Sequence, residues 1–128
     1  MIRLARLTLP ILLALTASSI AARAEPHAPA PAANCFWVHG RLSAANGAPT
    51  FRIWRIGTKR VLGVVDAEGG SDSAAILPDS VRTLVAPDAF KVYVMGDFRV
   101  CPLAADRPGH MRMVRVVEAR RLITHPVD

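Results

Sequence analysis

The sequence predicts a small all-β domain, and three observations carry that prediction. Apolar and polar residues alternate with a period of two over several short segments, as in half-buried strands. Gly, Asn, Asp and Pro residues punctuate these segments at the spacing of turns. No long segment has the period of an amphipathic helix. We therefore expect a small antiparallel β-sandwich with one disulfide, with a small β-barrel as the alternative.

The first 24 residues have the features of a cleaved signal peptide. Arg3 and Arg6 provide a positive start, and a hydrophobic segment follows at residues 7–15. That segment is too short to cross a bilayer of roughly 30 Å as a helix. Residues 22–24 read Ala-Arg-Ala, which fits the small-residue pattern of a cleavage site. We expect cleavage after Ala24, a periplasmic or secreted protein, and no stable membrane span after cleavage.

The remainder of the chain is long enough for one small domain. Residues 25–34 alternate Ala and Pro and predict a flexible leader, so that residues 35–128 form a single β domain. The whole chain has a net charge of +6, of which three positive charges belong to the signal peptide. The remaining surplus favours anionic partners through long-range attraction. The arginines are spread along the chain, and export separates it from nucleic acid, so we do not expect nucleic-acid binding.

Two cysteines, Cys35 and Cys101, lie far apart in the sequence. In an exported protein such a pair favours a disulfide over metal ligands or free thiols. The chain has no C-x-x-C motif that would produce a reactive thiolate. We expect a structural disulfide that stabilises the domain by about 4 kcal/mol in the chain-entropy description.

The alternating segments define the expected elements. Strands are predicted at 35–43, 50–56, 61–66, 81–86, 90–95, 98–101 and 111–118, with a last short element at 120–124. The intervening segments 70–80 and 102–110 are predicted loops. Residues 92–101 fit either a hairpin that turns at Gly96-Asp97 or one bent strand with a glycine bulge, and the pattern leaves both open.

The first hairpin is the most informative segment. Asn46-Gly47 is typical of a two-residue type I′ turn, because both central positions need a positive φ. That turn would place Leu42 opposite Phe51, Arg41 opposite Arg52 and His39 opposite Trp54. One side of the hairpin is then apolar and predicts a core face: Phe36, Val38, Leu42, Phe51 and Ile53.

The other side of the hairpin is aromatic and basic, and we call it the candidate binding face: Trp37, His39, Arg41, Arg52 and Trp54. Two arginines opposite each other are unfavourable without an acid between them. That acid could be Asp97, Glu118 or a ligand. Trp54 has an alternative structural role, because the expected third strand would place it over Gly63.

Catalytic chemistry has little support in the sequence. None of the motifs of a nucleophilic serine, a zinc protease, a phosphate-binding loop or a dinucleotide site occurs. The acids Asp66, Glu68 and Asp72 lack the order of a calcium loop and predict an ordinary turn. We expect no catalytic residue, cofactor or metal. The alternative is a small metal-handling protein or enzyme that uses His39 and His110.

Several segments together resemble a family of small exported bacterial proteins: Cys35–Leu42, Asn46–Pro49, Arg52–Thr58, Arg60–Gly63, Gly96–Leu103 and Pro108–Met111. The resemblance covers most of residues 35–118. It implies a secreted or periplasmic location and a conserved cysteine pair, and it brings no activity with it. Residues 36–70 also resemble the opening of transthyretin-like and carboxypeptidase-regulatory-like β-sandwich modules, which implies an appended binding or stabilising role.

The expected function follows from these points. We expect a non-catalytic envelope or secreted module that binds a protein or a glycan through the candidate binding face. Besides the histidine-based alternative, a purely structural or inhibitor-like protein also fits the sequence.

Overall fold

The structure is a computed structural model, and it describes residues 34–128. The predicted signal peptide with its cleavage site at Ala24, and all of the predicted leader except Asn34, lie outside the described residues. The described chain contains five strands, a 3₁₀ turn and one α-helix. Their order is β1 (Phe36–Ala44), β2 (Phe51–Arg55), β3 (Val61–Val64), η2 (Ala74–Ile76), α1 (Asp79–Val85), β4 (Val92–Pro102) and β5 (Arg112–Pro126).

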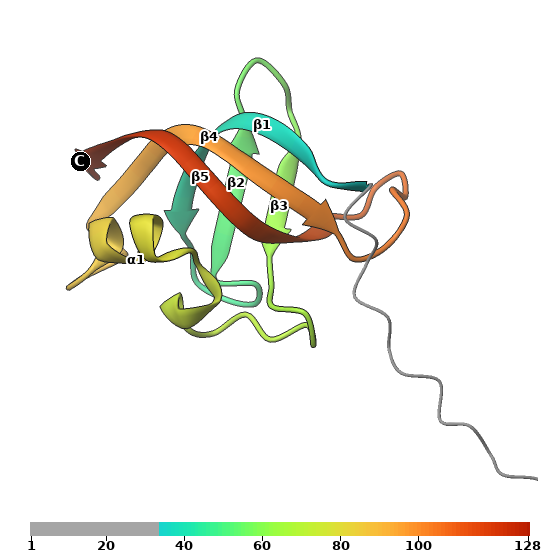
Figure 1. Cartoon of the computed structure of the whole chain (residues 1–128), viewed down its shortest axis with the longest axis horizontal. Helices are drawn as coiled ribbons and strands as arrows, with labels where there is room; N and C mark the ends of the chain where they lie inside the picture. Colours follow the sequence, from blue (N-terminus) through green and yellow to red (C-terminus); the bar gives the residue numbers. More distant parts are fainter. Residues whose placement is uncertain (1–33) are drawn as a thin grey trace, which may run out of the picture.

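The five strands form one sheet that closes into a barrel in the order β1-β2-β3-β5-β4 (Figure 1). Strands β3 and β5 are parallel, and the other neighbours are antiparallel. Because β4 returns to lie beside β1, the first four strands make a Greek key. A five-stranded Greek-key barrel is the architecture of the OB-fold. The predicted all-β class is confirmed, and the sheet forms the barrel of the alternative rather than two packed sheets.

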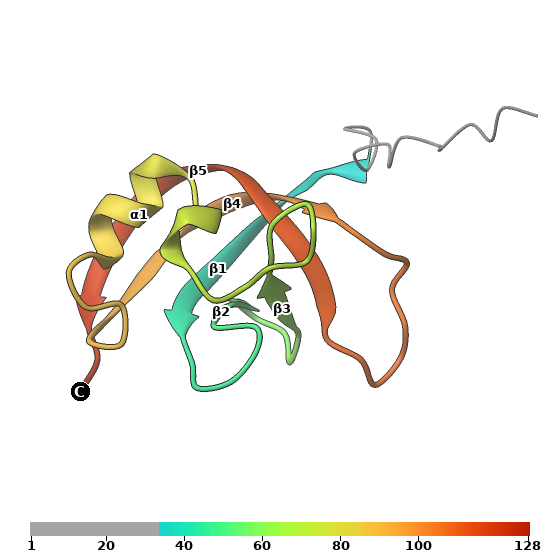
Figure 2. The same ribbon diagram turned by 90° about the horizontal axis from the view of Figure 1, so that it is seen from below.

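A single apolar core fills the barrel. Val38, Leu42, Ile53, Val94 and Phe98 are almost completely buried and come from the inward positions of β1, β2 and β4. Helix α1 adds Val81 and Val85 to the same core. The helix lies at one end of the barrel, and the β4–β5 loop lies at the other end (Figure 2). The predicted core face of the first hairpin is confirmed, with Phe36 partly buried at its edge.

Two glycines face each other where β1 and β4 bend. Gly40 pairs with Gly96, and both occupy inward positions of their strands. A Cβ at Gly40 would lie 2.5 Å from Ile53 Cγ2, and a Cβ at Gly96 would lie 2.5 Å from Leu122 Cδ2. The absence of side chains therefore lets core residues of the neighbouring strands fill the inside of the bend.

Residues 81–86 were predicted as a strand and form helix α1 instead. The helix begins after Pro78, whose fixed φ suits the start of a helix, and Asp79 places a carboxylate in its first turn. Val81 and Val85, four residues apart, are its buried positions. In so short an apolar segment the helical and strand periods overlap, and packing against the open barrel end decides between them. The predicted loop at 70–80 contains η2 and the first residues of the helix.

The last two strands are longer than predicted. Residues 92–102 form one strand, and the pairing with β5 shifts between Met95 and Asp97, so the bent strand is confirmed and the hairpin is wrong. Strand β5 joins the two predicted elements at 111–118 and 120–124. Arg121, at φ 53°, lies at the irregularity that takes β5 past the bend.

The register of the first hairpin differs from the prediction by two residues. Leu42 pairs with Ile53 and Arg41 pairs with Trp54, so the two arginines are not opposite each other. The strands end at Ala44 and Phe51, and the Ala45 N–H donates to the carbonyl oxygen of Thr50 at 2.8 Å just beyond them, so the connection is longer than the predicted two-residue turn. A shift of two residues keeps every side chain on its predicted side of the sheet.

The predicted cover for Gly63 is also wrong. Gly63 pairs with Arg52, whereas Trp54 pairs with Val61. A Cβ at Gly63 would lie 2.6 Å from Pro49 Cγ and 2.6 Å from Met113 Sδ. The β1–β2 loop and strand β5 thus cover the position that was assigned to the Trp54 ring.

The predicted disulfide between Cys35 and Cys101 is present, with an S–S distance of 2.03 Å. It joins the residue before β1 to the penultimate residue of β4, at the barrel end away from α1. A disulfide is consistent with an oxidising compartment.

The disulfide closes a loop with a sequence separation of 66 residues. We expect Cys35→Ser/Cys101→Ser to lower the free energy of unfolding by about 4 kcal/mol, chiefly because the unfolded chain gains entropy. Urea denaturation of the variant and of the wild type, with and without a reductant, measures this effect. Reduced wild type should match the variant. A loss below about 1 kcal/mol would show that the bond contributes little.

Candidate functional site

The five residues of the candidate binding face lie on the outside of β1 and β2, as predicted. Trp54 is 43% exposed, and the His39 side chain is 60% exposed. The structure therefore brings the five residues together on one surface. Their contacts decide what that surface can do.

Two of the β1 residues make cation–π contacts with the neighbouring strands. The Arg41 guanidinium lies 3.9 Å from the centre of the Tyr93 ring, and Arg120 lies 4.0 Å from the centre of the Trp37 ring. Tyr93 also stacks on His125 of β5. The face thus continues across β4 and β5, and its aromatic rings are partly covered by the protein's own cations.

The two β2 residues fasten adjoining turns. Arg52 Nε donates a hydrogen bond to the carbonyl oxygen of Pro49 at 3.1 Å, which ties down the β1–β2 loop. Trp54 Nε1 donates to the carbonyl oxygen of Thr58 at 2.7 Å in the β2–β3 turn. Both side chains therefore have structural roles, although Trp54 stays exposed.

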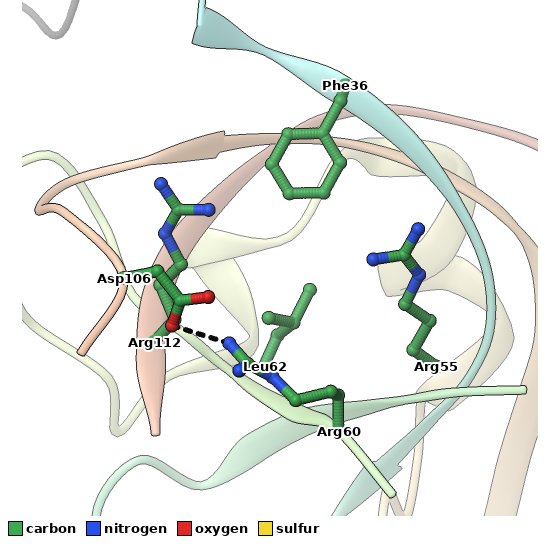
Figure 3. Close-up of a pocket in the computed structure, with 6 residues that line it drawn as sticks. All are labelled: Phe36, Arg55, Arg60, Leu62, Asp106 and Arg112. Carbon is green, nitrogen blue, oxygen red and sulfur yellow. Dashed lines mark hydrogen bonds and ion pairs between the residues drawn. The ribbon is translucent and has the colours of Figure 1, made fainter. Parts of the chain in front are cut away.

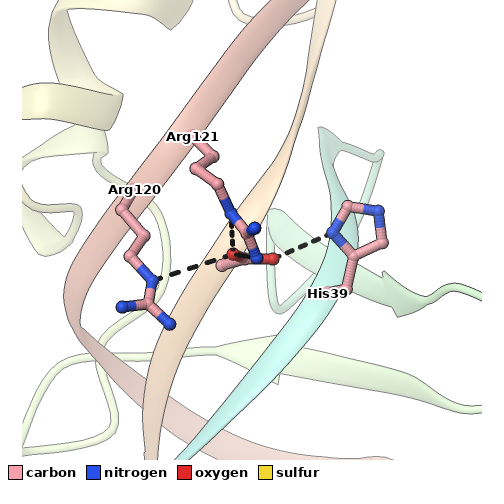
Figure 4. A network of polar contacts seen from close by, with 4 residues as sticks. His39, Arg120 and Arg121 are labelled. Carbon is pink, nitrogen blue, oxygen red and sulfur yellow. Dashed lines mark hydrogen bonds and ion pairs between the residues drawn. The ribbon is translucent and has the colours of Figure 1, made fainter.

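Asp97 is the polar centre of this surface, because His39, Arg120 and Arg121 all approach its carboxylate; Figure 4 labels these three residues. Its side chain is only 6% exposed, although it is on the outward side of β4. The carboxylate accepts a hydrogen bond from His39 Nδ1 at 2.9 Å and another from Arg121 Nε at 2.5 Å, and Arg120 Nε lies 3.7 Å away. The hydrogen bond from His39, and next the one from Arg121, hold the pKa of Asp97 below its usual value.

The observed register separates Arg41 from Arg52, so no acid between them is needed. Asp97, one of the two carboxylates considered for that place, contacts neither arginine and pairs with His39, Arg120 and Arg121. Glu118, the other, lies 3.9 Å from Arg99. Within the face, His39 is paired with a carboxylate, whereas the contacts of Arg41 and Arg52 are with the Tyr93 ring and with the carbonyl oxygen of Pro49.

The two histidines of the metal-handling alternative have different contacts. His39 binds Asp97, whereas His110 Nε2 lies 3.1 Å from Arg107 in the β4–β5 loop. Within residues 34–128, no three His, Cys, Asp or Glu side chains are grouped as a metal site would require.

A surface pocket of about 180 Å³ lies at the barrel end away from α1 (Figure 3). Its six lining residues come from the starts of β1, β3 and β5, the end of β2, and the two loops beside them: Phe36, Arg55, Arg60, Leu62, Asp106 and Arg112. We call it the arginine pocket. Phe36 and the buried Leu62 form its apolar part. Arg55 and Arg112 lie on opposite sides of Leu62 (Figure 3).

Only one of the three arginines in this pocket is paired with a carboxylate. Arg60 donates to Asp106 at 2.6 Å, and this hydrogen bond holds the pKa of Asp106 below its usual value. Arg112 Nε donates to the carbonyl oxygen of Ala104 at 3.2 Å, and its guanidinium lies 5.9 Å from the centre of the Phe36 ring. Within residues 34–128, no carboxylate lies within 4.0 Å of the Arg55 or Arg112 guanidinium nitrogens.

This pocket has no local signature in the sequence. Residues 55–62 and 103–112 lie far apart in the chain and meet only when the sheet closes into a barrel. The one available indication is their shared charge, since the two segments together hold five basic residues and one acidic residue. Phe36 was assigned to the core, where it packs at the edge.

Comparisons with known proteins leave the site to be judged on its geometry. The chain matches no protein-family model, no curated protein and no solved structure. Among the described residues, no helix is long and apolar enough to cross a membrane.

The Asp97 network predicts a pH-dependent contribution to stability. Because the pKa of Asp97 is lower in the folded protein than in the unfolded chain, its stabilising effect is present above about pH 4 and is lost as the pH falls through the folded value. We expect Asp97→Asn to be less stable than the wild type at neutral pH. The difference should shrink in acid, as measured by urea denaturation across a pH series. A difference that stays constant down to about pH 2 would contradict this assignment.

Proposed function

We propose that this protein is a non-catalytic module of the periplasm or the extracellular medium, and that it binds an anionic glycan at the arginine pocket. The proposal keeps the class of function expected from the sequence and moves the binding site. The candidate binding face becomes a mainly structural surface.

The observation that carries the proposal is that two guanidinium groups without a carboxylate partner line one pocket. Arg41 and Arg52 also lack a carboxylate partner among the described residues, but Arg41 lies over the Tyr93 ring and Arg52 holds the β1–β2 loop. Arg55 and Arg112 hold positive charge beside an apolar wall, with the cation Lys59 in the adjacent turn. In contrast, residues 66–91, which run from β3 through α1 to β4, contain five acidic and two basic residues. This separation of charge would orient an approaching polyanion toward the pocket end.

The dimensions of the pocket favour a glycan over a protein partner. Stable protein interfaces bury roughly 800 Å² on each partner, usually on broad surfaces with a buried apolar centre. A pocket of about 180 Å³ is also below the roughly 300 Å³ at which sites for drug-sized ligands begin. The pocket is large enough for one charged sugar unit of a glycan. The rest of the glycan would lie outside the pocket, along the β2–β3 turn and the β4–β5 loop.

The fold supports the same conclusion by analogy. OB-fold barrels bind oligosaccharides and oligonucleotides on strands 2 and 3 and the adjoining loops. The arginine pocket includes residues of β2, β3 and the β4–β5 loop. The expected signal peptide and the disulfide favour an exported location, which separates the protein from most nucleic acid. Fold analogy alone does not establish function, so the arginines carry the argument.

The test compares two matched charge-reversal variants, Arg55→Glu/Arg112→Glu in the pocket and Arg41→Glu/Arg52→Glu on the candidate binding face. Each changes the net charge by the same amount. We expect the wild type to bind soluble dextran sulfate and not neutral dextran, and the affinity to fall as NaCl rises from about 0.05 to about 0.5 M. The pocket variant should lose at least tenfold in affinity, because two attractive charges become repulsive. The face variant should lose much less.

Other outcomes overturn the proposal. A larger loss in the face variant would return the site to the candidate binding face. Equal losses would indicate attraction to net charge without a specific site. Circular dichroism and thermal unfolding of all proteins ensure that the comparison uses folded material.

A further inference from the structure

We propose that the anionic group held in the arginine pocket is a phosphate monoester carried by a sugar. This inference rests on the proposed function and specifies its ligand chemistry. It depends on the number of charges in the pocket, on the directions from which they approach, and on the apolar wall between them.

The charge of the pocket matches a doubly charged ligand. Arg55, Arg60 and Arg112 contribute three positive charges, and Asp106 contributes one negative charge. Asp106 neutralises Arg60, to which it is hydrogen-bonded, and two guanidinium charges remain. A phosphate monoester carries a charge of about −1.5 to −2 at neutral pH. A carboxylate or a sulfate ester carries a single charge and would leave one arginine uncompensated.

The positions of the two arginines also fit a group with several oxygens. Arg55 reaches the pocket from the end of β2, and Arg112 reaches it from the start of β5 on the other side of Leu62 (Figure 3). Each guanidinium presents a planar fork of N–H donors that suits phosphate oxygens. Arg112 uses its Nε on the carbonyl oxygen of Ala104, which fixes the side chain and leaves its terminal nitrogens for the ligand. A phosphate offers three acceptor oxygens, which is enough for a hydrogen bond to each fork.

The rest of the pocket suits the carbon part of a sugar. Phe36 and Leu62 provide an apolar surface between the arginines. Binding sites commonly combine such a surface with a few polar groups that fix orientation. The Arg60–Asp106 pair closes another side, and its Asp106 oxygens can also accept hydrogen bonds from sugar hydroxyl groups. The pocket therefore has a place for the phosphate and a place for the unit that bears it.

The proposal predicts a pH dependence that comes from the ligand. Between about pH 5 and 7.5 a phosphate monoester loses its second proton, and the fraction of dianion rises about tenfold. The arginines of β2, β5 and both loops stay charged over this range, as does Lys59. Asp106 stays ionised because its pKa is lowered. His110, in the β4–β5 loop, lies 3.1 Å from Arg107. A cationic His110 would strengthen anion binding, in the opposite direction to the proposed effect.

The experiment measures binding of glucose 6-phosphate, glucose 6-sulfate and glucuronate to the mature protein by calorimetry at about pH 5 and about pH 7.5. We expect the affinity for glucose 6-phosphate to rise up to about tenfold with pH, in proportion to the dianion. Affinities for the sulfate and the carboxylate should be lower at neutral pH and should not rise. Arg55→Gln and Arg112→Gln should each remove the preference for phosphate. Arg82→Gln on α1, at the other end of the barrel, is the matched control and should keep it.

Each contrary result has one meaning. Equal affinities for phosphate and sulfate at both pH values would overturn the phosphate assignment, while dextran sulfate binding that depends on Arg55 and Arg112 would leave the glycan function intact. Absence of dextran sulfate binding by the wild type would overturn the glycan function itself. Loss of the phosphate preference in Arg82→Gln, with the variant folded, would show that overall charge rather than the pocket determines the effect.

Discussion

Closure of the barrel depends on β1, which pairs with β2 along one edge and with β4 along the other. Closing so few strands into a barrel requires curvature, and the facing glycines Gly40 and Gly96 allow it because neighbouring core side chains occupy the space where their own side chains would be. Closure has two consequences. It surrounds one apolar core that α1 covers at one end. It also brings the β2–β3 turn and the β4–β5 loop together at the other end, where the disulfide joins β1 to β4.

The sequence is a good guide to which way side chains point and a poor guide to long-range pairing. The first hairpin was assigned a register two residues away from the observed one, and the inward positions of Leu42 and Ile53 were still correct because a strand repeats every two residues. The segment 81–86 shows the opposite case. Its apolar residues fit either period, and helix α1 forms because Val81 and Val85 complete a core that the sequence alone does not describe.

The same contrast applies to the candidate binding face: the sequence predicts which way its side chains point, but it does not predict their partners on distant strands. Residues that are neighbours on one hairpin, such as Trp37 and Arg41, were correctly placed on one outer face. Their partners were not foreseeable in the same way, because Tyr93 and Arg120 reach them only through the pairing of β1, β4 and β5. Through those partners, Arg41 lies over the Tyr93 ring and Trp37 lies under Arg120, which also approaches Asp97. The arginine pocket is built from residues 55–62 and 103–112, which are far apart in the chain. The sequence indicates it only through the excess of basic residues in these two segments.

The central claim is that Arg55 and Arg112 hold the ligand and that the outer face around Asp97 does not. The most direct measurement is a ¹H–¹⁵N spectrum of the arginine Nε–H groups, assigned by single substitutions, during a titration with glucose 6-phosphate. The Nε–H signals of Arg55 and Arg112 should move together and saturate, while those of Arg41 and Arg52 stay in place. Saturating shifts at Arg41 and Arg52, with Arg55 and Arg112 unmoved, would contradict the account.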